Sequence, residues 1–243
     1  IKVWWEGDRA IVIEASEQYQ DFLGHELAEI NGYPLYELKD IAMQYLAYEN
    51  RYWKDALSPR FLHLAPVLAH EGIITANEPA SFIFLRSDGA VTQVDISSQA
   101  SVEDWVRIES LQETTPLYRL KDDNYSYTVD DELLYIHYTS AFSINDYPLS
   151  LFISQIEQTL SEQTISKIVV DLRFNWGGQI DHFVPVIEYL AGTDYNSEDK
   201  LFVLTGRNSF SSAVGAIYSF DSMTNATFVG GPTGGKPNGF SHV

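Results

Sequence analysis

The sequence predicts two domains: a β-rich module over residues 1–112 and an α/β domain over residues 113–243. Three observations support this prediction. Short strands with turn residues between them dominate the first half, whereas strands and helices alternate in the second half. A polar, proline-containing stretch over residues 113–124 separates the two halves. In the α/β domain we expect a mixed, mostly parallel sheet with helices on both faces, because right-handed crossovers cover such a sheet with helices.

The first half predicts strands around two turns. Residues 2–5 and 10–15 predict paired strands on either side of Glu6-Gly7-Asp8. A strand centred on residues 27–30 leads into Asn31-Gly32, which is a strong signal for a two-residue hairpin. The spacing of apolar residues predicts the other elements of this half: a helical stretch over 36–62 that Ser58-Pro59 interrupts, a helix over 62–68, strands within 81–97 and a short helix over 101–112.

The second half predicts alternating strands and helices. Residues 125–129 and 133–138 predict a hairpin, and the continuous apolar run 167–172 predicts a buried parallel strand. Because motifs at the strand ends of such a sheet converge on one edge, we expect the active site there. The remaining predicted elements are strands over 201–204 and 226–229, a helix over 149–160 with Asp146 as its cap and Pro148 in its first turn, a helix over 181–190, and a helix that starts at Ser211.

The composition excludes several classes of function. The chain has 243 residues, and its 34 acidic and 15 basic side chains give a formal net charge of −19. This negative charge disfavours binding to nucleic acid or to an anionic membrane, because like charges repel. Because there is no cysteine, disulfides and thiolate metal sites are excluded. No apolar run approaches the length that crosses a bilayer, and we predict no cofactor.

Residues 208–236 carry the strongest functional signal. Ser211 opens an apolar-periodic run that predicts a helix, so its hydroxyl would lie beside the unpaired N–H groups of the helix start. Lys236 follows after a predicted strand and a Gly-Pro-Thr-Gly-Gly turn. A serine and a desolvated lysine form a nucleophile and base pair. The alternative is that Ser211 only caps the helix.

A phosphate-binding loop is a competing interpretation of the glycine-rich turn. Residues 230–236 fit the pattern G-x-x-x-x-G-K. Position 237 is proline, however, where that loop needs a serine or threonine hydroxyl for its metal ion. Asn238-Gly239 then continues a turn instead of a helix. We therefore favour the serine interpretation.

Two other polar pairs favour structural roles or no site. Asp171 and Arg173 are expected to form an ion pair that anchors a turn, in preference to a catalytic role. His63 and His70 are seven residues apart, but Pro66 between them argues against one continuous helix. Without a nearby carboxylate or cysteine cluster, we do not expect them to bind a metal ion.

Three motifs in order resemble the C-terminal processing peptidases, also called tail-specific proteases. Residues 167–178, KIVVDLRFNWGG, match the strand and glycine turn of that family, D-L-R-x-N-x-G-G. Residues 211–214 match its nucleophile segment, S-x-[SA]-x before a helix. Residues 230–236 match its G-x-P-T-x-G-K motif, and the step from Ser211 to Lys236 also fits.

The resemblance implies a serine peptidase of ClpP-like or crotonase-like fold that uses a Ser-Lys dyad. Ser211 would be the nucleophile and Lys236 the general base, in an apolar site that favours the neutral lysine. The N–H of Ser212 and that of Gly177 or Gly178 would hold the oxyanion. The implied partner is a polypeptide substrate, cut in its C-terminal tail or while unfolded. The implied location is extracytoplasmic or secreted.

Members of this family carry a PDZ domain before the catalytic domain. Residues 23–35, LGHELAEINGYPL, resemble the PDZ core G-D-x-I-x-x-I-N-G-x-P, with His25 where aspartate is usual. The helical residues after it would be an insertion. Gly24, His25 and Leu27 would then bind substrate by strand addition, with backbone N–H groups holding the terminal carboxylate. The alternative is a generic hairpin.

The sequence also departs from the family. Position 240 is Phe, where members with the dyad often have a glutamine four residues past the lysine, and Val214 replaces the usual acidic residue. The same fold serves in retinoid-binding proteins of the eye, so a non-catalytic protein that binds peptides or small ligands is the alternative function. The last strands of the family's catalytic domain have no counterpart in this sequence, and we expect the chain to be part of a longer protein.

Overall fold

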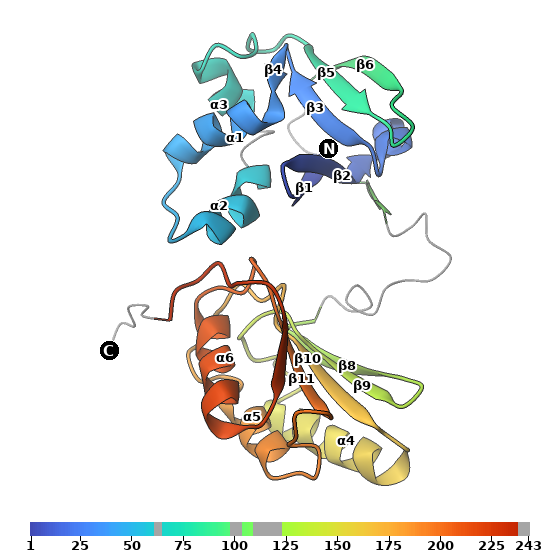
Figure 1. Ribbon diagram of the computed structural model, residues 1–243, viewed down its shortest axis with the longest axis vertical. Helices are drawn as coiled ribbons and strands as arrows, with labels where there is room; N and C mark the ends of the chain where they lie inside the picture. Colours follow the sequence, from blue (N-terminus) through green and yellow to red (C-terminus); the bar gives the residue numbers. More distant parts are fainter. Residues whose placement is uncertain (61–64, 98–103, 109–122, 238–243) are drawn as a thin grey trace. The chain divides into compact units, whose positions relative to one another are not determined.

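The computed structural model describes residues 1–60, 65–97, 104–108 and 123–237 (Figure 1). Contacts within the chain divide it into two compact units. The first unit comprises Ile1–Tyr48 and Lys54–Thr115, and the second comprises Glu49–Trp53 and Pro116–Val243. The predicted domain boundary at 112/113 falls outside the described residues, and the assignment of Glu49–Trp53 to the second unit has no counterpart in the prediction.

An antiparallel sheet forms the centre of the first unit. Its strands lie in the order β1-β2-β3-β5-β6, and β4 and β7 pair with β3 and β2. At the predicted hairpin, Asn31 and Gly32 have φ angles of 50° and 79°, the left-handed values that a two-residue turn requires. The strands are β1 (Lys2–Glu6), β2 (Arg9–Ser16), β3 (Glu26–Ile30), β4 (Tyr33–Pro34), β5 (Ala80–Leu85), β6 (Val91–Ile96) and β7 (Trp105–Arg107).

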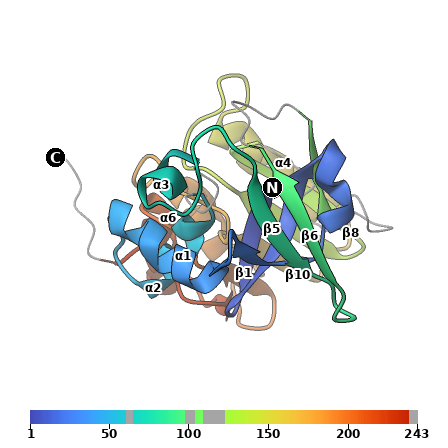
Figure 2. The same cartoon turned by 90° about the horizontal axis from the view of Figure 1, so that it is seen from above.

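The helical residues after the hairpin are broken into short pieces. Figures 1 and 2 show α1 and α3 together on one side of the first unit's sheet. The interruption predicted at Ser58-Pro59 is confirmed, since α2 ends at Leu57. A second break was not predicted: Leu46 has extended dihedral angles, and Asn50 starts a new helix by accepting the N–H of Trp53. The pieces are α1 (Leu35–Ala42), η2 (Met43–Tyr45), α2 (Arg51–Leu57), η3 (Ser58–Arg60) and α3 (Ala65–His70), and a further short helix, η1 (Glu17–Phe22), lies before the hairpin.

The short helix predicted over 101–112 is wrong where the structure describes it. Trp105–Arg107 form β7, which pairs antiparallel with Glu14–Ser16 of β2. Tryptophan and valine favour strands, and pairing with a sheet edge outweighs their apolar spacing. The other residues of that prediction lie outside the described residues.

A second sheet, in the order β12-β11-β10-β9-β8, forms the centre of the second unit. The strands β9 to β12 are parallel, and β8 is antiparallel to β9. This confirms the prediction of a mixed, mostly parallel sheet in an α/β arrangement. The strands are β8 (Tyr125–Asp130), β9 (Leu133–Tyr138), β10 (Lys167–Asp171), β11 (Leu201–Thr205) and β12 (Thr227–Gly230).

Three helices connect the parallel strands: α4 (Leu149–Glu162), α5 (Val184–Ala191) and α6 (Ser212–Met223). The helix α4 begins directly after Pro148, which occupies the cap position predicted for Asp146. The helix α5 begins three residues later than predicted, after Phe183.

All three helices contribute to one core against one face of the sheet. The core joins Leu134, Ile136, Ile168, Val170, Leu201 and Val203 of the sheet to Phe152, Ile156, Val186, Ile187, Leu190, Ala216 and Phe220 of the helices. The prediction of helices on both faces is therefore wrong for the described residues. The cause is the strand order. Each connection from β9 to β12 moves to the next strand in the same direction along the sheet, and right-handed connections in one direction place all their helices on the same face.

No helix among the described residues is long and apolar enough to span a bilayer.

The shared core predicts a sharp contrast between neighbouring positions of α4. Phe152 is fully buried, whereas Leu151 is 42% exposed. We expect Phe152→Ala to lower the free energy of unfolding by about 3–5 kcal/mol. Leu151→Ala should change it by less than about 0.5 kcal/mol. Urea unfolding followed by circular dichroism measures both values, and equal losses in the two variants would contradict this account of the core.

Candidate active site

Ser211 lies in a sharp, strained turn between a strand and a helix. Residues 206–210 follow β11, Ser211 has φ 54° and ψ −123°, and α6 begins at Ser212. A residue with a Cβ atom seldom adopts these angles, and such strain concentrates at functional sites. The Ser211 side chain is exposed, as a nucleophile on a strand–turn–helix elbow must be. Ser211 makes no side-chain cap hydrogen bond to the helix, so the helix-cap interpretation has no support in the described residues.

The Gly177-Gly178 turn lies against this serine. A methyl group in place of the Gly177 hydrogen would lie 2.6 Å from Cβ of Ser211 and 3.1 Å from its Oγ. A methyl group at Gly178 would lie 2.5 Å from the carbonyl oxygen of Ala141. Both glycines also have positive φ angles, 101° and 141°. Only glycine fits at either position, and its small size brings this backbone against the serine.

The backbone N–H groups around Ser211 differ in their availability. The N–H of Gly177 donates to Oδ1 of Asn175 at 2.8 Å. The N–H groups of Gly178 and Ser212 have no acceptor within the part of the chain that the structure describes. Of the two predicted glycine donors, Gly178 is therefore the one free to receive an oxyanion together with Ser212.

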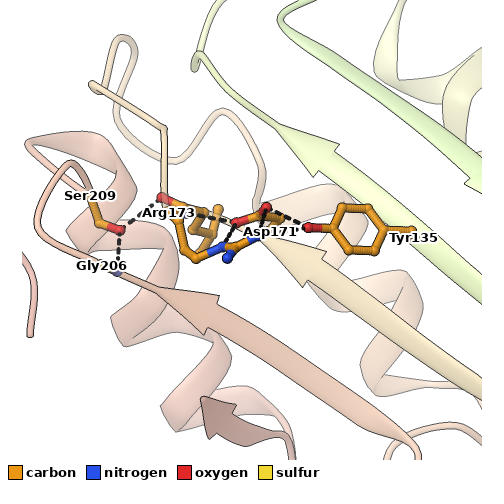
Figure 3. A network of polar contacts seen from close by, with 6 residues as sticks. Tyr135, Asp171, Arg173, Gly206 and Ser209 are labelled. Carbon is orange, nitrogen blue, oxygen red and sulfur yellow. Dashed lines mark hydrogen bonds and ion pairs between the residues drawn. The ribbon is translucent and has the colours of Figure 1, made fainter. Parts of the chain in front are cut away.

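Asn175 and Ser209, both fully buried, tie the glycine turn to the serine turn. Nδ2 of Asn175 donates to the carbonyl oxygen of Tyr138 at 3.0 Å, and its own carbonyl oxygen accepts the N–H of Phe210 at 3.0 Å. Oγ of Ser209 donates to the carbonyl oxygen of Leu172 at 2.8 Å and accepts the N–H of Gly206 at 3.1 Å (Figure 3). These bonds join the ends of β9, β10 and β11 at one edge of the sheet.

Asp171 and Arg173 form an ion pair that stabilises the same edge (Figure 3). Asp171 is buried and accepts hydrogen bonds from Nε and Nη2 of Arg173 at 3.0 and 2.8 Å, and from the hydroxyl of Tyr135 at 2.5 Å. Burial lowers the pKa of Arg173, but the hydrogen bonds and charge of Asp171 outweigh it and raise the pKa overall. Burial, and then the charge of Asp171, raise the pKa of Tyr135, so its hydroxyl remains a donor. The ion pair matches the structural role expected from the sequence.

The turn that carries Lys236 also reaches the serine. A methyl group at Gly235 would lie 3.2 Å from the backbone nitrogen of Ser211 and 2.7 Å from Cγ2 of Val214. The N–H of Gly235 donates to the carbonyl oxygen of Ser209 at 3.1 Å. The three motifs of residues 167–178, 211–214 and 230–236, far apart in sequence, thus meet around Ser211.

The Lys236 side chain differs from the expectation. We expected an apolar, desolvated site, but Lys236 is exposed. Its backbone N–H donates to a carboxylate oxygen of Glu49 at 2.8 Å. The sequence around Lys236 holds no acidic residue, and Glu49 supplies one from 187 positions away. No local pattern predicts this contact.

A small gap, with no room for a water molecule, lies beside the start of α6. It is lined by Tyr138, Asp181, His182, Phe183, Val184, Ser212, Ala216 and Ser219. Burial lowers the pKa of His182, so its neutral form is favoured. Nδ1 of His182 lies 3.5 Å from the hydroxyl of Tyr138, and Nε2 lies 3.3 Å from Oγ of Ser143. No sequence pattern singles out His182, because an isolated histidine carries no signal by itself.

The three substrate-binding residues expected in the first unit are engaged in its own fold. Leu27 is buried, and β3 pairs with β2 on one side and β5 on the other. The N–H of Gly24 donates to the carbonyl oxygen of Val12 at 2.9 Å, and that of His25 to Phe22 at 3.0 Å. Strand addition beside Leu27 stays a prediction, since β3 pairs with β5 along its length but with β2 only between Glu26 and Ile11.

Within the described residues, no group of three or more histidine, aspartate and glutamate side chains could hold a metal ion. His63 lies outside the described residues, so its predicted lack of a metal role stays a prediction.

Comparisons with known proteins identify the fold. No protein-family model matches the chain, and no curated protein is similar in sequence. Mature CPAF complexed with lactacystin aligns at a TM-score of 0.57 and 12% identity, over 96% of this chain and 73% of that chain. A second structure of mature CPAF aligns at 0.56 and 12% identity, over 98% and 71%. A putative S41 protease from Bacteroides fragilis aligns at 0.38 and 12% identity, over 96% and 62%. The two CPAF structures show that this chain shares their fold.

The strained turn predicts an unusual effect of glycine at position 211. Ser211→Gly should relieve about 1–3 kcal/mol of backbone strain, against about 0.5–1 kcal/mol of added chain entropy in the unfolded state. Ser211→Ala keeps the Cβ atom and therefore the strain. We expect Ser211→Gly to be more stable than Ser211→Ala by about 1 kcal/mol in urea unfolding. If Ser211→Ala is the more stable variant, Ser211 does not have the backbone conformation described here.

Proposed function

We propose that this protein is a serine peptidase that hydrolyses peptide bonds with Ser211 as its nucleophile. The observation that carries the proposal is the strained Ser211 elbow with two free N–H donors, those of Gly178 and Ser212, in the adjacent backbone. Peptidases are among the structural neighbours, so the shared fold supports the proposal. The site provides what acyl transfer needs, an exposed hydroxyl beside fixed donors.

The proposed mechanism has two steps. Oγ of Ser211 attacks the peptide carbonyl while Lys236, in its neutral form, takes the hydroxyl proton. The oxyanion accepts hydrogen bonds from the N–H groups of Gly178 and Ser212. Removal of a single donor of this kind lowers kcat by about 10²–10³-fold. The C–N bond then breaks as the lysine returns the proton to the leaving amine. In the second step water hydrolyses the acyl-enzyme and frees Ser211.

Lys236 sets a condition on this mechanism. Lys236 is exposed, whereas a lysine that acts as a general base needs the desolvation of an enclosed, apolar site. We propose that the bound polypeptide covers Lys236 and supplies this desolvation. A substrate that does so must run along the turn of residues 230–236 as an extended chain. C-terminal tails and unfolded polypeptides meet this requirement, because their backbone is free of other pairing.

The second candidate function is a non-catalytic binding protein of the same fold. The exposure of Lys236 favours it, because a base that is not desolvated is a sign of lost activity. Phe240, where the resembling family often has a glutamine, agrees with it. Such a protein would bind peptides or small ligands without forming an acyl-enzyme.

Covalent labelling distinguishes the two functions. A fluorophosphonate probe should label the wild-type protein at Ser211, because the probe's phosphorus is attacked as a peptide carbonyl would be. We expect no labelling in Ser211→Ala and labelling slowed at least about 100-fold in Lys236→Ala. Mass spectrometry of tryptic peptides measures the extent and the position of the label.

Cleavage of an unfolded protein such as reduced casein should accompany the labelling, since Ser-Lys enzymes can react slowly with such probes. Cleavage lost in both variants supports the peptidase. A folded wild-type protein that neither labels nor cleaves is a binding protein instead.

The contact between Gly177 and Ser211 makes a second prediction. Gly177→Ala should lower kcat/KM by at least about 100-fold, because the added methyl group displaces the nucleophile. Gly215→Ala is the matched control, since nothing lies within 4 Å of its added methyl group and alanine favours helices. Steady-state cleavage of a fluorogenic peptide measures both. Unchanged kcat/KM in Gly177→Ala would mean that this glycine does not border the reacting hydroxyl.

A further inference from the structure

Residues 49–53, hereafter the 49–53 segment, lie in the first half of the sequence but belong to the second unit. The side chains of Asn50 and Trp53 contact two of the three motifs that meet at Ser211, and Trp53 also contacts Phe210, the residue before the third. We propose that Asn50 and Trp53 are positioning residues of this site. They hold the turn of residues 231–237, hereafter the lysine turn, in a fixed position relative to the turn that carries Ser211. The proposal rests on the serine peptidase function proposed above and assigns a new role within it.

Asn50 holds the turn that precedes Lys236. Its Nδ2 donates to the carbonyl oxygens of Gly234 at 2.8 Å and of Thr233 at 3.3 Å. Its Oδ1 accepts the N–H of Trp53 at 2.9 Å, which caps α2 and fixes the orientation of the amide. One side chain therefore connects the start of a helix to the lysine turn, and only an amide offers the acceptor and the donors together.

Trp53 supports the residues that directly precede Ser211 and Gly177. Its ring stacks on Phe210, with centroids 3.9 Å apart and planes 5° apart, and Phe210 directly precedes Ser211. It also meets Trp176, which directly precedes Gly177, at 4.9 Å. Gly234 packs against the same indole, since a methyl group there would lie 2.6 Å from Cε3. Trp53 is 6% exposed, so these contacts enclose it.

The lysine turn depends on these contacts because it has few others. Residues 231–237 form no helix or strand. Among the described residues, the hydrogen bonds that hold residues 234–236 run from Asn50 to Gly234, from Lys236 to Glu49, from Gly235 to Ser209 and from Oγ1 of Thr233 to the carbonyl oxygen of Gly235. Loss of the Asn50 bonds would release the lysine while leaving the sheet and the serine elbow intact. Because a displacement of about 1 Å at a catalytic group costs about 100-fold in rate, the effect should be large.

Asn50→Asp separates positioning from folding. A carboxylate at this position still accepts the N–H of Trp53 and caps α2, but it cannot donate, and it repels the carbonyl oxygens of Thr233 and Gly234. We expect kcat to fall about 10- to 100-fold with KM changed by less than about threefold. The control is Asn225→Asp, which makes the same charge change at an exposed asparagine whose side chain also donates to a carbonyl oxygen.

Hydrogen exchange provides a readout that does not depend on activity. The amides of Gly235 and Lys236 donate hydrogen bonds in the wild-type turn. In Asn50→Asp we expect peptides that cover residues 231–237 to exchange at least about tenfold faster. Peptides that cover β10 and α6 should exchange at the wild-type rate, as should all peptides of Asn225→Asp.

Trp53 is tested by a pair of substitutions. Trp53→Phe keeps a ring stacked on Phe210 and should retain most of kcat, whereas Trp53→Leu should lose it about tenfold or more. Tyr52→Phe, at the neighbouring position, should match the wild-type protein. Recovery of kcat by the aromatic variant supports positioning through the ring.

The outcomes separate this inference from the proposed function. If the wild-type protein cleaves peptides and Asn50→Asp retains its kcat within twofold, the positioning role is overturned. If the wild-type protein neither cleaves nor labels, the peptidase proposal fails, and exchange then decides the positioning role. In that case faster exchange confined to residues 231–237 in Asn50→Asp supports the role, and unchanged exchange overturns it.

Discussion

The close approach of the Gly177 backbone to Ser211 is the constraint on which the candidate site depends. With 2.6 Å between the position of a Gly177 methyl group and Cβ of Ser211, no other residue fits. Gly178, whose N–H has no acceptor among the described residues, directly follows the glycine that contacts Ser211, and the Ser211 backbone is itself strained. Strain of this kind persists only when the surrounding structure determines it from several sides. Here Asn175, Ser209 and the Asp171–Arg173 pair do so.

The sheet brings motifs that are distant in sequence together at the ends of its parallel strands. The parallel strands β9, β10 and β11 end together, and buried hydrogen bonds from Asn175 and Ser209 join their last residues. Each bond satisfies a backbone group that would otherwise be buried without a partner, so stability and site geometry are coupled. The lysine turn is different, because it lies beyond β12 and depends on the 49–53 segment. Rigid elements thus position Ser211, whereas a few side-chain contacts position Lys236.

The sequence was sufficient to predict features that local chemistry determines. Alternating strands, the Asn31-Gly32 hairpin and the helix that starts after Ser211 follow from periodicity and turn residues. The sequence did not predict the common side of α4, α5 and α6, because strand order is not encoded in any single segment. It also placed Lys236 in an apolar site, whereas tertiary contacts leave that turn exposed. Trp53 resembled any core aromatic residue, and its role depends on partners more than 100 positions away.

The central claim is that the N–H groups of Gly178 and Ser212 hold the oxyanion formed at Ser211. A crystal structure of the protein with a peptide aldehyde tests it most directly. We predict a tetrahedral adduct on Oγ of Ser211, with its oxygen about 2.7–3.1 Å from both nitrogens. An adduct whose oxygen points to solvent or to the Gly177 nitrogen would contradict the account, as would an aldehyde that does not bond to Ser211 at saturating concentration.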